Sequence, residues 1–410
     1  MKSGVHAYTS ISTNYIPKAR VLADSVKRVQ PDVTFHLLLS DDPPADFDIS
    51  REPFDNLILT ENLPIEDFRQ WAFSHRLVEL CTAVKGPGLE YIFDQFGAEK
   101  VFYFDPDIAV FSRLDELAGE LDDNSILLTP HQSEPETTMR GIIDNEICSL
   151  RHGVFNLGFL GVANSAQGRR FSRWWRDRLL HFCRDDLHRS LFTDQKWVNL
   201  APCMFDEIRI LRSPAFNVAT WNLSTRQATG SLKEGILING EPLGFYHFSG
   251  LDSGAQERQL REYGQHSPIL FELRAWYLQQ CEKHGQEVLG KIPCKYSRYD
   301  DGADITDGQR LLYGLRADLR RTFPDPFKTS GFPDPELTGG YQAWYKANRG
   351  ADPATGVLSL APEATVREFL QSASTHLEGF RAEATRTGWH KKFALGATAR
   401  LLRSLARLAN

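Results

Sequence analysis

The sequence predicts an α/β protein in which helices cover a mostly parallel central sheet and a helical extension follows. Up to about residue 250, short apolar runs rich in β-branched and aromatic residues alternate with stretches of helical periodicity. Beyond about residue 252 the pattern becomes helical, with loops rich in proline, glycine and aspartate. We therefore expect an α/β domain over residues 1–265, a helical accessory segment over 266–385 and a C-terminal helix over 386–410.

A strand–helix–strand unit opens the chain. We expect an apolar strand at residues 5–12, a helix with proline in its first turn at 17–29, and a second strand at 34–39. This order is typical of a parallel sheet, because parallel strands need a crossover connection. The next expected segments are a strand at 57–60, a helix at 68–84 that ends before Gly86-Pro87, and a helix at 89–96.

The sharpest signal is the run KVFYFDPDIAVF at residues 100–111, which Asp105, Pro106 and Asp107 interrupt. Two carboxylates thus stand where a buried strand leaves the sheet, and ligands of open α/β sheets bind at such strand ends. Carboxylates separated by one residue can share a hard cation such as Mg²⁺ or Mn²⁺, which could neutralise a departing diphosphate. The alternative is a turn in which Asp-Pro-Asp serves local hydrogen bonding.

Later segments complete the expected domain and its extension. Strands are expected at 125–129, 154–162, 208–211 and 244–248, and helices at 168–183, 267–284 and 308–323.

Five motifs in one order resemble a known enzyme family. They are the opening stretch TSISTNYIPKARVLADSVKRVQPDVTFHLLLSD, then FYFDPDIAVF, FNLGFLGV, TDQKWVNL and YHFSG. Together they make residues 5–250 similar to the GT-A glycosyltransferases, with their Rossmann-like fold, of the glycogenin and lipopolysaccharide galactosyltransferase type and their bacterial polysaccharide relatives. The resemblance implies an enzyme of the hexosyltransferase type that moves a sugar from a nucleotide-sugar to a glycan acceptor. UDP is the favoured nucleotide, and bacterial surface polysaccharide synthesis is the expected setting.

The resemblance also implies which residues bind the donor. Asp105, Asp107 and His247 match the residues that hold Mn²⁺, or Mg²⁺, across the donor diphosphate. The remaining matches are the nucleotide-pocket residues Ala7, Tyr8 and Thr9, the base neighbour Tyr15, the phosphate-facing Lys85, Asp105 itself, and the small turn residues Ser249 and Gly250. Asp194, Gln195 and Asn156 match residues at the sugar and the reaction centre.

Each of these assignments has a structural alternative. His247 and the first strand could be plain buried structure, and Lys85 could be an exposed lysine at a helix end. Asn156 could be a core amide bonded to the backbone, and Asp194 could cap a helix. Arg76 is a weaker candidate for the task of Lys85.

The chain departs from the family pattern after YHFSG. The family's Lys-Pro-Trp is absent, and LDSGAQERQ follows instead. This leaves open which lysine meets the phosphate and which stereochemistry the reaction follows. Retention of the anomeric configuration is expected if the chemistry follows that of the closest relatives. Inversion would need a carboxylate base for the acceptor hydroxyl, and the sequence does not identify one.

Composition excludes several other classes of protein. The formal net charge of -6 argues against a nucleic-acid-binding protein, because neutralising phosphates requires a basic surface. The six cysteines are scattered without the close pairing of a zinc site or disulfide framework, which fits a reducing cytoplasm. The opening residues turn polar too early for a secretory signal, and no run approaches the roughly 20 apolar residues of a membrane span. We expect a cytoplasmic protein.

The last stretch, WHKKFALGATARLLRSLARLAN at 389–410, predicts a basic amphipathic helix. Its leucines fall on one side, opposite Arg400, Arg403 and Arg407. Such a helix can lie on an anionic membrane, so peripheral contact with the inner face of the plasma membrane, where a lipid-linked glycan acceptor would be found, is one expectation. Packing on the chain's own core or on a partner is the other.

Two rival functions remain open. A sugar nucleotidyltransferase on a related sheet would need a glycine-rich basic loop after the first strand, which TSISTNYIPK lacks. A non-catalytic glycan-binding scaffold would have a lapsed site, whereas Asp105, Asp107 and His247 are all present.

Overall fold

The computed structural model describes residues 4–331 and 337–348. The chain divides into two compact units, each described here by itself. The first unit comprises Met1–Glu66 and Arg76–Ser297, and the second comprises Asp67–His75 and Arg298–Asn410. The helix expected at 386–410 and the end of the expected accessory segment lie outside the described residues.

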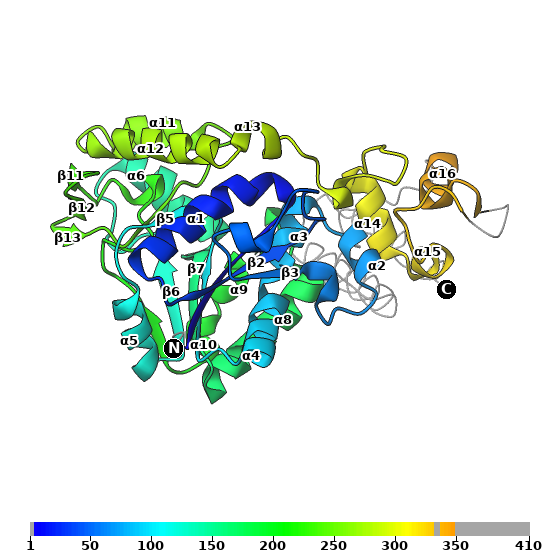
Figure 1. The fold of residues 1–410 in the computed structure, drawn as a ribbon, viewed down its shortest axis with the longest axis horizontal. Helices are drawn as coiled ribbons and strands as arrows, with labels where there is room; N and C mark the ends of the chain where they lie inside the picture. Colours follow the sequence, from blue (N-terminus) through cyan, green and yellow to red (C-terminus); the bar gives the residue numbers. More distant parts are fainter. Residues whose placement is uncertain (1–3, 332–336, 349–410) are drawn as a thin grey trace, which may run out of the picture. The chain divides into compact units, whose positions relative to one another are not determined.

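A seven-stranded sheet forms the centre of the first unit, in the order β10-β6-β7-β4-β1-β2-β3 (Figure 1). Its strands are β1 (Val5–Ile11), β2 (Thr34–Leu39), β3 (Asn56–Leu59), β4 (Lys100–Phe104), β6 (Ile126–Pro130), β7 (Phe155–Ala163) and β10 (Ile208–Ile210). β7 runs antiparallel to both of its neighbours, and the other neighbouring pairs are parallel. The predicted α/β class with a mostly parallel sheet is confirmed.

Helices cover both faces of this sheet. On one face, α1 (Ile16–Val29) and α5 (Asp115–Asp123) share an apolar core with the inward side chains of β1, β2 and β4. On the other face lie α4 (Lys85–Phe96) and α8 (Ala166–Phe182), which pack against each other (Figure 1). A Cβ on Gly86 would come within 2.7 Å of the Arg176 backbone, so glycine permits this close helix contact.

The single helix expected at 68–84 is wrong. The segment forms α2 (Phe68–Phe73) and α3 (Leu77–Ala83), and α4 then begins at Lys85. The break has a local cause, because the Glu79 carboxylate accepts the backbone N–H of Arg76 at 3.0 Å and so caps a new helix there. Gly86-Pro87 lies in the first turn of α4 instead of ending the preceding helix. Proline is tolerated there because it lacks only a backbone N–H that would have no partner within the helix.

The run expected as one interrupted strand at 100–111 belongs to two sheets. β4 ends at Phe104, and β5 (Ile108–Val110) pairs antiparallel with β14 (Phe245–His247) in a separate two-stranded sheet. The register places His247 opposite Ile108 and therefore beside Asp107. This pairing joins two segments that lie far apart in the sequence.

Shorter elements surround the sheet. They are α6 (Met139–Gly141), a π-helical turn (Ile142–Glu146), α7 (Ile147–His152), β8 (Asp185–Asp186), β9 (Leu191–Phe192), α9 (Gln195–Val198), α10 (Ala201–Met204), β11 (Ala228–Ser231), β12 (Gly235–Ile238) and β13 (Glu241–Pro242).

The first unit continues past the boundary expected near residue 265. It includes α11 (Ala255–Tyr263), α12 (Ile269–Lys283) and α13 (Gln286–Leu289). The physical reason is a second apolar core, in which α12 packs against β14 and the segment after it. Tyr277 of α12 stacks on Phe248 with ring centroids 3.8 Å apart.

The second unit is helical. It contains α2, α14 (Asp307–Leu315), α15 (Ala317–Thr322) and α16 (Gly340–Ala347). The helix expected at 308–323 is split, because the backbone of Arg316 is extended. Phe73 of α2 is the centre of an aromatic cluster, with the rings of Tyr313, Phe327 and Tyr341 at 5.0, 5.0 and 5.5 Å.

Candidate active site

A pocket of about 580 Å³ lies in the first unit, at the carboxyl ends of β1 and β4. Its lining comes from β1, the turn after β4, β7, the segment before α9, and β14. Most of the predicted site residues line it: Tyr15, Lys85, Asp105, Asp107, Asn156, Asp194, Gln195, His247 and Ser249. The structure therefore brings together residues that the sequence spreads over more than 200 positions.

Asp105, Asp107 and His247 converge on one point of this pocket. Nε2 of His247 lies 3.0 Å from Oδ1 of Asp107 and 3.9 Å from Oδ2 of Asp105. One ligand atom from each residue lies within 4.8 Å of the others. Two carboxylates and one imidazole are a donor set that fits Mn²⁺ or Mg²⁺, so these residues could hold such an ion.

The pKa values of His247 and Asp107 are shifted in opposite directions. Burial alone would lower the pKa of His247, but the neighbouring carboxylates of Asp107 and Asp105 raise it above its ordinary value. Burial alone would raise the pKa of Asp107, but His247 lowers it. Asp107 and His247 therefore each shift the pKa of the other toward its charged form.

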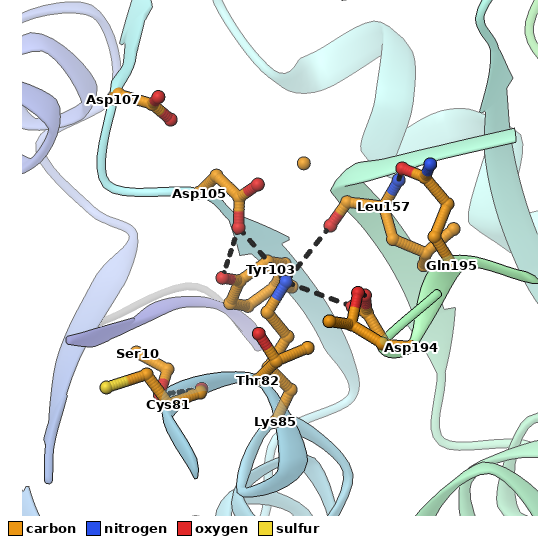
Figure 2. A network of polar contacts seen from close by, with 12 residues as sticks. Ser10, Cys81, Thr82, Lys85, Tyr103, Asp105, Asp107, Leu157, Asp194 and Gln195 are labelled. Atoms are coloured by element: carbon orange, nitrogen blue, oxygen red, sulfur yellow. Dashed lines mark hydrogen bonds and ion pairs between the residues drawn. The ribbon is translucent and has the colours of Figure 1, made fainter. Parts of the chain in front are cut away.

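Lys85 links the triad to the other half of the pocket (Figure 2). Its Nζ lies 3.0 Å from Oδ1 of Asp105 and 3.0 Å from Oδ2 of Asp194. Tyr103 adds a 2.5 Å hydrogen bond from its hydroxyl to the same oxygen of Asp105. Lys85 is 4% exposed, and although burial alone would lower its pKa, the two aspartates raise it. The alternative of an exposed lysine at a helix end is wrong.

Asp194 directly precedes α9, and the sequence left open whether its side chain caps that helix. That side chain makes no capping hydrogen bond and instead pairs with Lys85. Thr193 before it has a left-handed backbone with φ 45°, and its hydroxyl donates to Oδ1 of Asp194 at 3.2 Å. A strained backbone that presents a buried carboxylate to a pocket is typical of functional sites.

The side chains of Gln195 and Asn156 are hydrogen-bonded to each other in the same pocket. Oε1 of Gln195 accepts from Nδ2 of Asn156 at 3.3 Å and from the backbone N–H of Leu157 at 3.2 Å. The other end of Gln195 donates to the carbonyl of His152 at 3.1 Å. Both amides are held rigidly, and three of the four hydrogen bonds of the Asn156 side chain are to other side chains.

The expected nucleotide-pocket residues of β1 lie elsewhere. Ala7 packs in the apolar core, the Tyr8 hydroxyl donates to the carbonyl of Lys85 at 2.8 Å, and Thr9 is buried. The pocket is lined instead by residues 10–12, at the carboxyl end of the strand.

Of four further predicted residues, two line the pocket and two do not. Tyr15 lines the pocket, and its hydroxyl donates to Oδ2 of Asp252 at 2.7 Å. Ser249 lines it too, whereas the adjacent Gly250 does not. Arg76 pairs with Glu79 and is also outside the lining.

Sequence reasoning missed four residues around the triad: His131, Gly158, Asn217 and Trp221. Trp221 packs edge-on against the His247 ring at 5.2 Å, and His131 contacts both Trp221 and Asn156. A Cβ on Gly158 would lie 2.4 Å from Cε1 of His247. Apart from the glycine in FNLGFLGV, these residues stand in loops, in the 3-10 turn Thr220–Asn222 or just after a strand, where periodicity gives no signal.

Comparison with known proteins adds the following. No family model matches the chain. Two proteins of Bacillus subtilis strain 168, both described as uncharacterized, are similar to it. YfnD is 26% identical over 253 residues, which is 60% of this chain and 78% of YfnD. YfnF is 29% identical over 156 residues, which is 37% of this chain and half the length of YfnF.

Several solved structures of glycosyltransferases resemble the chain. The galactosyltransferase LgtC, in complex with donor and acceptor sugar analogues, is 17% identical with a TM-score of 0.38 over 63% of this chain and 95% of LgtC. GlyE of Streptococcus pneumoniae TIGR4 is 16% identical with a TM-score of 0.37 over 72% of this chain and 66% of GlyE. Mouse xyloside xylosyltransferase 1 is 16% identical with a TM-score of 0.35 over 60% of this chain and 97% of that protein. Because these identities and TM-scores are low, the functional argument rests on the geometry of the pocket.

Proposed function

We propose that this chain is a metal-dependent glycosyltransferase that moves a sugar from a nucleotide-sugar, with UDP as the favoured nucleotide, to a glycan acceptor. The convergence of Asp105, Asp107 and His247 at the edge of a pocket carries this proposal. The same pocket contains a second group of rigidly held polar side chains, Asn156, Asp194 and Gln195. A cation site beside a polar cleft suits a substrate with a diphosphate at one end and a sugar at the other.

The metal triad would hold Mn²⁺ or Mg²⁺, which when bound supplies a Lewis acid that offsets the charge developing on a leaving diphosphate. Lys85 keeps Asp105 oriented toward that position and balances the buried charge of Asp194. Gln195 and Asn156 present fixed amides that can hydrogen-bond the hydroxyl groups of a sugar. Polar groups that are already in position can stabilise a transition state without the cost of moving during the reaction.

A calorimetric and thermal-shift panel tests the proposed donor. Nucleotide-sugars that bind the folded state raise its melting temperature, so a UDP-sugar with Mn²⁺ should raise it by several degrees. The Asp105→Asn variant should lose this shift, measured from its own metal-free melting temperature. If no nucleotide-sugar raises the melting temperature, with Mn²⁺ or Mg²⁺, the proposed function is wrong.

Hydrolysis of the donor separates this proposal from its rivals. A glycosyltransferase should release UDP slowly from a UDP-sugar in the presence of Mn²⁺, because water can replace the acceptor. A non-catalytic scaffold would bind without release, and a nucleotidyltransferase would form pyrophosphate or consume it. We further propose retention of the anomeric configuration, which NMR of the product tests directly.

The cellular setting is also a proposal. None of the helices in the described part of the chain combines the length and apolar character of a membrane span. We place the enzyme in the cytoplasm, at the inner face of the plasma membrane, with the basic segment 389–410 contacting anionic lipid and a lipid-linked acceptor in surface polysaccharide synthesis. Deleting 389–410 should abolish co-sedimentation with anionic liposomes and leave donor hydrolysis intact. Unchanged co-sedimentation would remove the membrane proposal.

A further inference from the structure

Two backbone N–H groups of β7 fix the direction of the hydrogen bonds around the metal triad. The N–H of Gly158 donates to Oδ1 of Asn156 at 3.1 Å, and the N–H of Leu157 donates to Oε1 of Gln195 at 3.2 Å. A backbone N–H can only donate, so both side-chain atoms must be the amide oxygens. The oxygen and nitrogen ends of an amide have nearly the same shape, so hydrogen bonds are needed to tell them apart. Here the two N–H groups determine the orientation of both amides.

The same logic extends from Asn156 to Asn217. Oδ1 of Asn156 is an acceptor, so the Asn217 atom 2.9 Å away must be the donor Nδ2. That Nδ2 also donates to Oγ1 of Thr129 at 2.9 Å, which uses its second proton. The remaining polar atom, Oδ1 of Asn217, faces Nδ1 of His247 at 3.3 Å.

An amide oxygen can only accept, so Nδ1 of His247 carries the proton in this contact. Nε2 is then the ring nitrogen left to face the carboxylates of Asp107 and Asp105. A histidine binds a metal through one nitrogen, and the hydrogen bond of its other nitrogen decides which one and fixes the ring.

We infer that Asn217 is a positioning residue that presents Nε2 of His247 to a divalent cation and ties the imidazole to the Asn156 amide. The inference rests on the proposed function, since it needs a cation at the triad. Asn217 itself is held firmly. It is 1% exposed, its backbone adopts the left-handed conformation with φ 51°, and the next residue bonds to β14 through Val218 N–H and the Phe245 carbonyl at 3.1 Å.

The test is the Mn²⁺ affinity of the Asn217→Gly variant, measured by electron paramagnetic resonance without nucleotide. Glycine accepts the left-handed backbone, so the variant removes the amide without adding strain. The matched control is Asn239→Gly, because Asn239 has φ 50° and bonds to Gln227 N–H, outside the pocket lining. Asn217→Gly should bind Mn²⁺ about 10- to 100-fold more weakly than wild type, and Asn239→Gly should bind it equally well.

The outcomes separate this inference from the proposed function. If wild type does not bind Mn²⁺ or Mg²⁺, the metal site fails and the role of Asn217 fails with it. If wild type, Asn239→Gly and a folded Asn217→Gly bind Mn²⁺ equally, only the role of Asn217 is wrong. The melting temperature in EDTA shows whether each variant is folded.

A second measurement is made on the wild-type protein and does not need Asn217→Gly. Nitrogen-15 NMR of the histidines in Mg²⁺-saturated wild type should show His247 with a proton on Nδ1 and none on Nε2. Loss of the signal in His247→Gln assigns it. A proton on Nε2 with Nδ1 free would overturn the inference.

Discussion

Lys85 holds two carboxylates together inside the protein, and this makes it a sensitive point for stability. Asp194 is 3% exposed, and Lys85 is the cation 3.0 Å from its carboxylate. Removing one partner of a buried ion pair typically costs about 3–5 kcal/mol, because the other charge stays buried. Lys85→Met should therefore lower the free energy of unfolding by about that amount, measured by urea denaturation.

The double variant Lys85→Met, Asp194→Asn provides the internal control. It removes both charges, so it should be more stable than Lys85→Met alone. Strictly additive effects of the two substitutions would show that the pair is not coupled and would contradict this account.

Gly158 makes room for the His247 ring, and this gives a second local prediction. A Cβ at this position would lie 2.4 Å from Cε1 of His247 and 2.7 Å from Oδ1 of Asn156. Gly158→Ala should displace the imidazole and lower Mn²⁺ affinity by about tenfold or more. Gly161→Ala on the same strand is the control, since its Cβ would meet Leu127 at 3.1 Å and neither His247 nor Asn156. Equal Mn²⁺ affinities of the two variants would contradict the prediction.

Asp105 and Asp107 could be found from the local pattern, because they interrupt an apolar run. His247 and Asn156 are polar residues in apolar strands, but their roles were expected mainly from the resemblance. Ala7, Tyr8 and Thr9 lie outside the lining because only the carboxyl end of β1, from Ser10 onward, reaches the pocket. Asn217 could not be predicted, since its role arises only from contacts with residues 30, 61 and 88 positions away.

The start of α3 depends on one buried carboxylate. Glu79 accepts from the backbone N–H groups of Arg76 and Asp185, both at 3.0 Å, and pairs with the guanidinium of Arg184 at 3.2 Å. Burial alone would raise the pKa of Glu79, but Arg184 and the two N–H groups lower it, and the net shift is downward. This carboxylate therefore links α3 to the segment that leads to Asp194.

The pH dependence follows from the sign of that shift. Because the folded pKa lies below the unfolded value of about 4.3, the stabilisation is complete above that value and is lost as the pH falls through the folded pKa. Glu79→Gln should be less stable than wild type at pH 7, and the difference in unfolding free energy should shrink below about pH 4. A difference that stays constant down to pH 3 would contradict this assignment.

The sheet strands were predictable to within one or two residues, whereas two long helices were not. Apolar runs of strand length between turn residues identify strands directly. The break at residues 74–76 and the break at Arg316 lie within stretches of continuous helical periodicity, and the first of them is fixed by Glu79 accepting a backbone N–H. The β5 and β14 pairing was also beyond local patterns, since strand partners are set by long-range packing.

The division into two units makes α2 dependent on residues near the far end of the chain. Phe73 packs among aromatic rings that come from residues 299–341, within the second unit. A chain that ends at Ser297 should therefore expose Phe73 and bind a hydrophobic dye more strongly than the full chain. Phe73→Ser in the shortened chain should reduce that dye binding. A shortened chain with the dye binding of the full chain would contradict the prediction.

The central claim is that a divalent cation, held by Asp105, Asp107 and His247, binds a nucleoside diphosphate in this pocket. Calorimetric titration of UDP into the protein with Mn²⁺, and again with EDTA, tests it most directly. UDP should bind at least about tenfold more tightly with Mn²⁺, a difference of about 1.4 kcal/mol, and the Asp105→Asn, Asp107→Asn double variant should lose that gain. Equal UDP affinity with and without Mn²⁺, or full Mn²⁺-dependent binding by the folded double variant, would contradict the account.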